Sequence, residues 1–129
     1  MQIIVVGAGK VGTSLTAQLI REHRVTVIDQ EPRLIENIIN VYDVMGVCGN
    51  GASYEVQKEA EVGKADLLIA TTSSDEINIL ACLVAKKLGA VSYTHLDVYK
   101  RQALEHGHAV LYDHGGAGHH AAGHSLGPV

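Results

Sequence analysis

Short apolar runs alternate with longer amphipathic stretches over the first ninety residues of the chain. The apolar runs are rich in Val and Ile and predict four strands, at residues 2–6, 25–29, 44–48 and 67–71. The stretches between and after them carry apolar residues at helical spacing and predict four helices, at about residues 10–22, 32–41, 53–61 and 73–88. This alternation predicts an α/β fold with a parallel sheet, right-handed crossovers and helices on both faces.

Residues at the ends of these segments support the helix assignments. Pro32 stands in the first turn of the second helix, where its missing N–H costs little. Ser73 and Glu76 form an S-x-x-E pattern, which predicts a capping box at the start of the fourth helix. Gly89 stands where that helix is expected to end.

The turn between the first strand and the first helix reads GAGKVG, a G-x-G-x-x-G pattern. Gly7 permits a tight turn, Gly9 lets the backbone approach a pyrophosphate, and Gly12 lets the helix pack close to the strand. Asp29 ends the second strand, where a carboxylate accepts hydrogen bonds from a ribose 2′-hydroxyl. Together they predict a dinucleotide-binding unit in a Rossmann-like doubly wound parallel sheet. The alternative is a glycine turn that serves only to pack the helix against the strand and binds no ligand.

The predicted ligand position is the crevice at the carboxyl ends of strands one and four, where the strand order reverses. The free N–H groups and the positive dipole end of the first helix would face the phosphates there. Asp29 favours NAD(H) over NADP(H), because a carboxylate repels a 2′-phosphate. ATP and ADP remain open, because they share the ribose and adenine contacts.

Composition limits the classes of binding partner and the cellular compartment that we expect for this protein. The 129 residues suffice for one domain with a sizeable core, and the formal charge of −4 argues against nucleic acid and against anionic membranes. Apolar runs are too short for a spanning helix, and Met1 leads directly into the first strand, so we expect no signal peptide and a cytoplasmic location. Cys48 and Cys82 form no CxxC pair and are expected to be small, buried, reduced thiols.

Three segments resemble the TrkA family of potassium-uptake regulators, whose nucleotide domains are called RCK or KTN domains. They are the opening IIVVGAGKVGTSLTAQL, the turn from Gly49 to Ala52, and the stretch ATTSSDEINILAC from Ala70 to Cys82. The segments occur in the family's order and spacing, and the resemblance covers residues 1 to about 90. Asn50 departs from the pattern, because the family's turn carries Asp there.

The resemblance implies a regulatory subunit rather than an enzyme. Members couple binding of NAD(H), or of ATP or ADP, to a membrane K⁺ transporter of the TrkH type. The resemblance also implies assembly into homo-oligomeric rings at the cytoplasmic face, with no direct insertion into the membrane.

The resemblance further implies a set of nucleotide contacts. Carried over by position, they are Gly7, Ala8, Gly9, Lys10, Val11 and Gly12 at the phosphates; Asp29 at the adenosine ribose; Asn50, Gly51 and Ala52 at the adenine; Thr71, Thr72 and Ser73 beside the phosphates and the distal half of the ligand; and Glu76 near the ligand or an inter-subunit contact.

The chain changes character after residue 91, so we expect a nucleotide domain over residues 1–91 and a His- and Gly-rich tail over 92–129. The run SYTHLDVYKRQ at the start of this tail resembles spurious sequence at the ends of metagenome-derived gene models. We expect a translated artefact or frameshift; the alternative is a divergent C-terminus. The sheet would then stop after its fourth βα unit, with strand four as an exposed apolar edge. The histidines match no closed metal site, and we expect no metal.

Two other classes of function stay open. An NAD-dependent oxidoreductase fragment would need a substrate domain with a general acid or base, and the 38 residues after Val91 are too few for one. No GxSxG, HExxH or Walker pattern is present. An interaction module that binds no nucleotide is also compatible with this fold.

Overall fold

A computed structural model describes residues 1–89, 92–95, 108–113 and 121–125. Its strands are β1 (Gln2–Val6), β2 (Arg24–Asp29), β3 (Met45–Cys48), β4 (Leu67–Ala70), β5 (Ser92–His95), β6 (His108–Asp113) and β7 (Ala121–Ser125). Its helices are α1 (Lys10–Leu19), α2 (Pro32–Val41), α3 (Tyr54–Glu59), the short 3₁₀ helix η1 (Val62–Lys64) and α4 (Asp75–Leu88). The four predicted strands and four predicted helices are all present, and their ends either agree with the prediction or differ from it by up to three residues.

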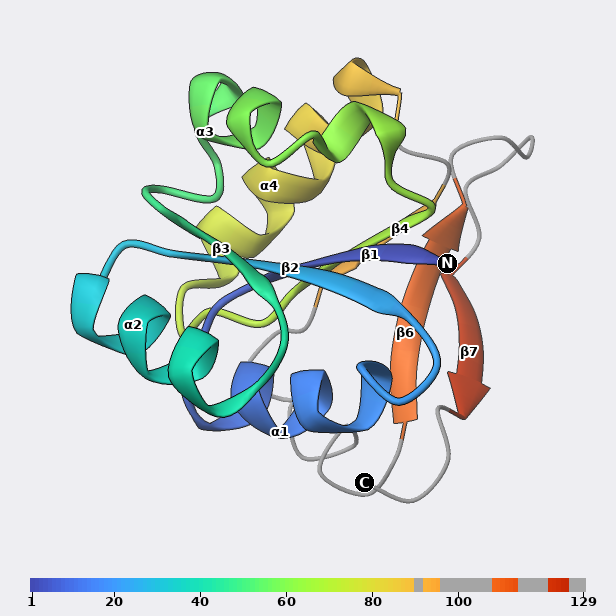
Figure 1. Cartoon of the computed structure of the whole chain (residues 1–129). Coiled ribbons are helices and arrows are strands. Elements are labelled where there is room, and N and C mark those ends of the chain that lie inside the picture. Colours follow the sequence, from blue (N-terminus) through green and yellow to red (C-terminus); the bar gives the residue numbers. More distant parts are fainter. Residues whose placement is uncertain (90–91, 96–107, 114–120, 126–129) are drawn as a thin grey trace.

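The sheet has the order β3-β2-β1-β4-β5-β6-β7 (Figure 1). Strands β1 to β5 are mutually parallel, whereas β6 and β7 pair antiparallel. Val6, the last residue of β1, is level with Ile28 on β2 and with Ala70 on β4. The carboxyl ends of these three central strands therefore lie side by side, which confirms the predicted reversal of strand order between β1 and β4.

Strand β4 is not an edge of the sheet. Its residues Leu67 to Ala70 pair in parallel with Ser92 to His95 of β5. The expectation of an exposed apolar edge at strand four is therefore wrong, because the segment after α4 adds a fifth parallel strand. The expected His-rich tail lies partly outside the described residues, which omit 96–107, 114–120 and 126–129.

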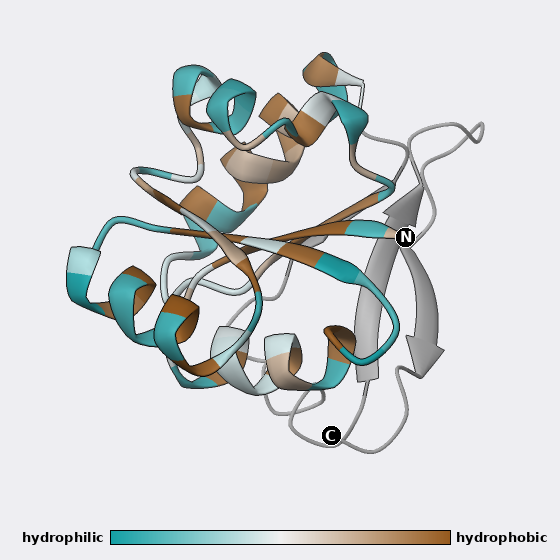
Figure 2. Cartoon of the chain, viewed as in Figure 1, coloured by the Kyte–Doolittle hydropathy of each residue, from teal (hydrophilic) through white to brown (hydrophobic). Residues whose placement is uncertain are grey.

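The core has two layers, one on each face of the sheet. Alternate residues of a strand point to opposite faces, so Ile4 and Val6 pack with α4 whereas Ile3 and Val5 pack with α1 and α2. Helices α1 and α2 cover one face and α3 and α4 cover the other (Figure 1). The central strands are apolar over most of their length (Figure 2), as expected for a parallel sheet covered on both sides.

The N-cap of helix α4 lies one residue later than the sequence pattern predicted. Ser74, not Ser73, is its N-cap, and the Ser74 hydroxyl accepts the N–H of Ile77 at 3.2 Å. The shift arises because Thr72 is tied to Asn78 inside the helix, which leaves Ser74 at the extended position before the first turn. The predicted C-terminus is confirmed: Gly89 has a φ of 99°, and its N–H donates to Ala85 and Lys86 carbonyls.

None of the helices in the described part of the chain is long and apolar enough to cross a membrane.

Candidate nucleotide-binding site

The three glycines of the first turn have three different surroundings. Gly7 has a φ of 115°, and a Cβ there would lie 2.7 Å from the Thr71 hydroxyl oxygen. A Cβ on Gly12 would lie 1.8 Å from the Gly7 carbonyl oxygen, so only glycine fits where α1 crosses the turn. A Cβ on Gly9 would meet no atom within 4 Å. Gly7 and Gly12 are thus required by the fold, whereas the space beside Gly9 is filled by no part of the protein.

Helix α1 begins at this turn, and no acidic side chain of the helix balances its positive N-terminal end. Its N-cap is Gly9, no side chain caps it, and its first turn contains no acidic residue. Lys10 instead places a cation at the first helical position, where the helix dipole disfavours positive charge. The free N–H groups and the ammonium group together favour a bound anion such as a phosphate.

Asp29 links the end of β2 to the glycine turn. One carboxylate oxygen, Oδ2, accepts the N–H of Ala8 at 2.8 Å, and the other, Oδ1, accepts the N–H of Glu31 at 2.8 Å. A carboxylate oxygen can accept two hydrogen bonds, so each oxygen retains the capacity to accept a ribose hydroxyl. The same side chain can therefore hold the glycine turn and still accept hydrogen bonds from a sugar.

A second turn follows β3 beside Asp29. The N–H of Gly49 donates to the Asp29 carbonyl at 2.9 Å. The side chain of Asn50 accepts the N–H of Ala52 at 2.8 Å, a bond that an Asp would also accept. Gly51 packs against Val6, and a Cβ there would lie 2.2 Å from Val6 Cγ1. Asn in place of the family's Asp therefore keeps the internal bond of the turn.

A third loop, after β4, is held by Asn78 on α4, a buried residue that the sequence analysis did not single out. Its Oδ1 accepts the N–H of Thr72 at 2.9 Å and the Thr72 hydroxyl at 2.7 Å, and its Nδ2 donates to the Thr72 carbonyl at 3.0 Å. The Thr71 hydroxyl donates to the Val6 carbonyl at 3.1 Å. These bonds fix the loop beside the carboxyl end of β1.

The three loops enclose a cavity of about 450 Å³, a size ordinary for a small-molecule site. Of the predicted contacts, nine line it: Gly7, Gly9, Lys10, Val11, Asp29, Gly51, Thr71, Thr72 and Ser73. Five do not: Ala8, Gly12, Asn50, Ala52 and Glu76. The remaining lining residues were not predicted: Val6, Ile28, Gln30, Leu34, Gly49, Ser74 and Ile77.

The five predicted residues outside the lining all adjoin it. Ala8 and Gly12 support the glycine turn, and Asn50 and Ala52 flank Gly51. Glu76 is exposed in the first turn of α4, where its carboxylate accepts the Ser74 hydroxyl at 3.1 Å. Most of the additional lining residues could have been found, because they are chain neighbours of predicted contacts; Leu34, in contrast, enters from α2.

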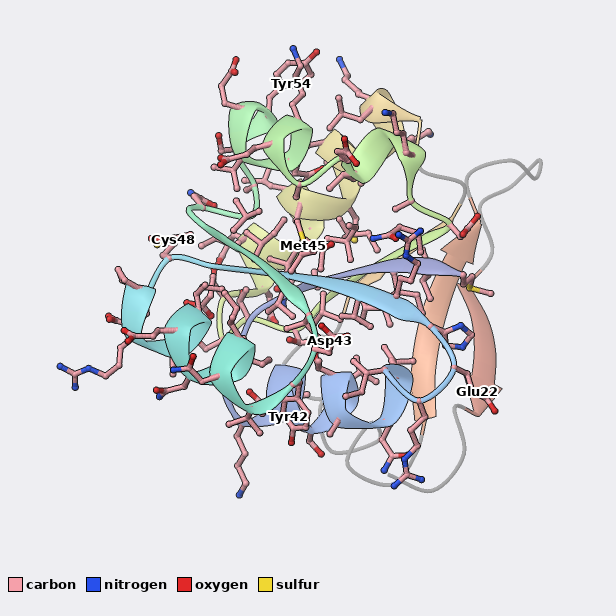
Figure 3. The ribbon with its side chains drawn as sticks, viewed as in Figure 1. Glu22, Tyr42, Asp43, Met45, Cys48 and Tyr54 are labelled. Carbon is pink, nitrogen blue, oxygen red and sulfur yellow. The ribbon has the colours of Figure 1, made fainter. Side chains whose placement is uncertain are left out.

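The two cysteines differ in exposure. Cys82 is buried on α4, as predicted, and burial raises the pKa of its thiol to about 12. Cys48 is exposed, so its predicted burial is wrong; it ends β3, the first strand in the sheet order (Figure 3). Among the described residues no cluster of His, Cys, Asp and Glu could hold a metal ion.

The sequence pattern of one family matches most of the chain. The TrkA-N domain model matches residues 3–115, past the boundary expected near residue 91. The chain belongs to the TrkA-N domain family. It is 32% identical over 114 residues to a "Trk system potassium uptake protein TrkA homolog" of Methanothermobacter thermautotrophicus, covering 82% of this chain and 53% of that protein. A homologue of the same name from Archaeoglobus fulgidus is 39% identical over 90 residues, covering 70% and 20%.

The TrkA-N domain here therefore spans about half of the first relative and about a fifth of the second. Solved structures share its fold. The TrkA-N domain of the inner membrane protein ybaL from Escherichia coli superposes with a TM-score of 0.70 at 21% identity, covering 79% of this chain and 77% of that one. The GsuK channel bound to NAD superposes with a TM-score of 0.66 at 20% identity, covering 80% and 19%. Dehydrogenases also share the fold, at 13–18% identity.

Proposed function

We propose that this TrkA-N domain binds NAD(H) in the cavity at the carboxyl ends of β1 and β4. The observation that carries the proposal is the convergence on one cavity of an uncapped helix N-terminus, a lysine, and a carboxylate that retains acceptor capacity. Phosphate, cation and ribose chemistry are thereby available within one site. The TrkA-N family match, together with the fold shared with an NAD-bound channel, supports the same ligand.

Each part of the cavity has a role in this proposal. The backbone at Gly9 and the ammonium group of Lys10 bind the pyrophosphate, and Asp29 binds the adenosine ribose. Gly51, flanked by Asn50 and Ala52, borders the adenine. The hydroxyl-rich loop from Thr71 to Ser73 borders the phosphates and the distal half of the ligand, and Glu76 lies at its outer side.

The charge distribution favours NAD(H) over other nucleotides. Asp29 repels a 2′-phosphate, which disfavours NADP(H). Lys10 is the one cationic side chain among the described residues that line the cavity, which suits the two phosphates of NAD better than the three of ATP. ATP and ADP share the ribose and adenine contacts and are the competing ligands in this proposal.

The regulated process is potassium uptake. The relatives are named as Trk system potassium uptake proteins, and we propose that this domain controls a membrane K⁺ transporter of the TrkH type from the cytoplasmic face. An apolar face on α4, where Ile79, Leu80 and Leu83 are about half exposed, supports a contact with a second copy in a homo-oligomer. Unequal affinity of the nucleotide for two arrangements of that assembly would shift their populations.

The proposed role is regulatory rather than catalytic. The described cavity lining contains Ser and Thr hydroxyls but no His or Cys that would act as base or nucleophile. The dehydrogenases that share the fold favour the competing role of an oxidoreductase fragment.

Calorimetric titration of the chain with NADH, NAD, ATP and ADP tests the ligand. Saturable binding, strongest for NADH or NAD, is the expected result. NADH oxidation with carbonyl acceptors, followed at 340 nm, tests the enzyme alternative, and turnover there would overturn the regulatory assignment.

A further inference from the structure

The side chain of Gln57 joins two parts of the protein that are distant in sequence. Gln57 lies on α3 and is fully buried. Its Nε2 donates to the Gly51 carbonyl at 2.8 Å and to the Ala81 carbonyl at 2.8 Å. Gly51 belongs to the turn after β3, and Ala81 lies on α4. One amide group therefore connects the turn that lines the cavity to the helix behind it.

The orientation of this amide follows from its neighbours. Two carbonyl oxygens face the amide as acceptors, and the nitrogen of Gln carries two hydrogens, so both hydrogens are used. The other atom of the amide, Oε1, is buried and accepts no hydrogen bond. A buried polar atom without a partner costs about 1–3 kcal/mol, a cost that an apolar side chain would avoid. The gain from Gln57 thus lies in the two bonds that its nitrogen donates.

The bond to Gly51 acts at a position that lines the cavity. The turn is tied at one end, where Gly49 donates to the Asp29 carbonyl. Within the turn, Asn50 accepts from Ala52, but this bond links the turn only to itself. Gln57 supplies the tie that holds the centre of the turn against the helical layer.

We propose that Gln57 is a positioning residue for the adenine side of the cavity. It holds the Gly51 carbonyl to α4, so that the turn is set in place before a nucleotide arrives. This inference rests on the proposed nucleotide site for its effect on affinity. Its effect on the turn itself can be measured without ligand.

The test compares the full chain with two variants by amide hydrogen exchange and AMP titration. Gln57→Met keeps the length of the side chain and removes both donors. Lys58→Met is the matched control, because Lys58 is exposed on the same helix. The amides of Ala52 and Ser53 report on the turn, and the amide of Thr13, which donates to the Gly9 carbonyl, reports on a distant part of the fold.

In Gln57→Met the amides of Ala52 and Ser53 are expected to exchange about tenfold faster, the effect of one lost hydrogen bond, while that of Thr13 is unchanged. AMP should bind several-fold more weakly, and Lys58→Met should match the parent chain in both measurements. Equal acceleration at Thr13 would show general destabilisation and overturn the inference, as would unchanged exchange in the turn.

One further outcome separates this inference from the proposed function. AMP binding that fails in the parent chain while the turn still responds to Gln57→Met would refute the nucleotide site and leave the turn-holding role. Gln57→Leu, a second apolar variant, replaces Gln57→Met in the same comparison when the first variant does not fold.

Discussion

Gly12 lies so close to Gly7 that a Cβ on Gly12 would sit 1.8 Å from the Gly7 carbonyl oxygen. The neighbouring atom is backbone, and Gly7 is itself held at a φ of 115° with its N–H donating to the Ile28 carbonyl at 2.7 Å. Neither side of the contact can move without breaking the turn. The close approach of α1 to β1, and with it the position of the helix N-terminus, depends on this pair.

Gly12→Ala is therefore expected to destabilise the fold by about 3 kcal/mol or more, as severe overpacking does. Urea unfolding followed by circular dichroism measures the change. Gly9→Ala is the matched control in the same motif, because its added methyl group meets no atom within 4 Å. Equal unfolding midpoints for Gly12→Ala and the parent chain would contradict the packing role of Gly12.

The sequence predicted the fold through residue 89 because each signal there is local. Val- and Ile-rich runs form the central strands, Pro32 marks the start of α2, and Gly89 ends α4 in the left-handed conformation that the sequence implied. The capping serine was misplaced by one residue because the bond between Thr72 and Asn78 fixes the start of α4. Strands β5 to β7 were not predicted, since the sequence after residue 91 lacks the pattern of the preceding units.

The candidate site was predictable where it follows the glycine motif, and less so where distant residues meet. Gly7, Gly9 and Asp29 line the cavity as their spacing indicated. Gln57 and Asn78 were not identified because their roles consist of contacts made in three dimensions. Gln57 donates to the Ala81 carbonyl, 24 positions away in the sequence, and no local sequence pattern predicts that bond.

Asp29→Asn is expected to affect both the fold and the choice of nucleotide. The carboxylate accepts N–H groups from Ala8 and Glu31, and Asn offers one oxygen for the two, so stability should fall by about 1–3 kcal/mol. Loss of the negative charge should also reduce the preference for NADH over NADPH from about tenfold or more towards parity.

Titration with the two cofactors measures that preference. Glu31→Gln is the control, because it removes a neighbouring charge and leaves the Asp29 carboxylate in place. A parent chain that binds NADPH as tightly as NADH would contradict the role of Asp29.

Asn78→Ala is expected to release the loop after β4. Thr72 would lose the Asn78 partner of its N–H, its hydroxyl and its carbonyl at once, although the hydroxyl would keep its bond to the Ser74 carbonyl. The free energy of unfolding should fall by about 2–4 kcal/mol. Asn37→Ala, on the exposed side of α2, should change it by less than about 0.5 kcal/mol. Chemical denaturation of both variants measures this difference. Similar unfolding midpoints for the two variants would contradict the role of Asn78 in holding the loop.

The two cysteines should react at different rates. Burial raises the pKa of the Cys82 thiol from 9.0 to about 12, so at pH 8 about one thiol in 10⁴ is ionised, whereas Cys48 is exposed. Iodoacetamide should therefore label one site in the folded chain and both sites in urea, as measured by mass spectrometry. The folded Cys48→Ser variant should take up no label at Cys82. Rapid labelling of Cys82 in that variant would contradict the burial of its thiol.

The same pKa gives a stability effect with a definite sign. Above about pH 9 the unfolded chain loses the Cys82 proton while the folded chain keeps it, so this thiol lowers stability as the pH rises from 9.0 towards 12. Cys82→Ala should unfold with a shallower dependence on pH over that range. Identical slopes for the variant and the parent chain would contradict the raised pKa.

The most direct test of the nucleotide site is the affinity for NADH of the parent chain and of Gly9→Ala. The methyl group of the variant would occupy the space that the proposal assigns to the pyrophosphate, while the fold has room for it. We predict saturable binding by the parent chain, at least about tenfold weaker binding by Gly9→Ala, and unfolding midpoints that differ little. Equal affinities, or no binding by a folded parent chain, would contradict the assignment of this cavity as a nucleotide site.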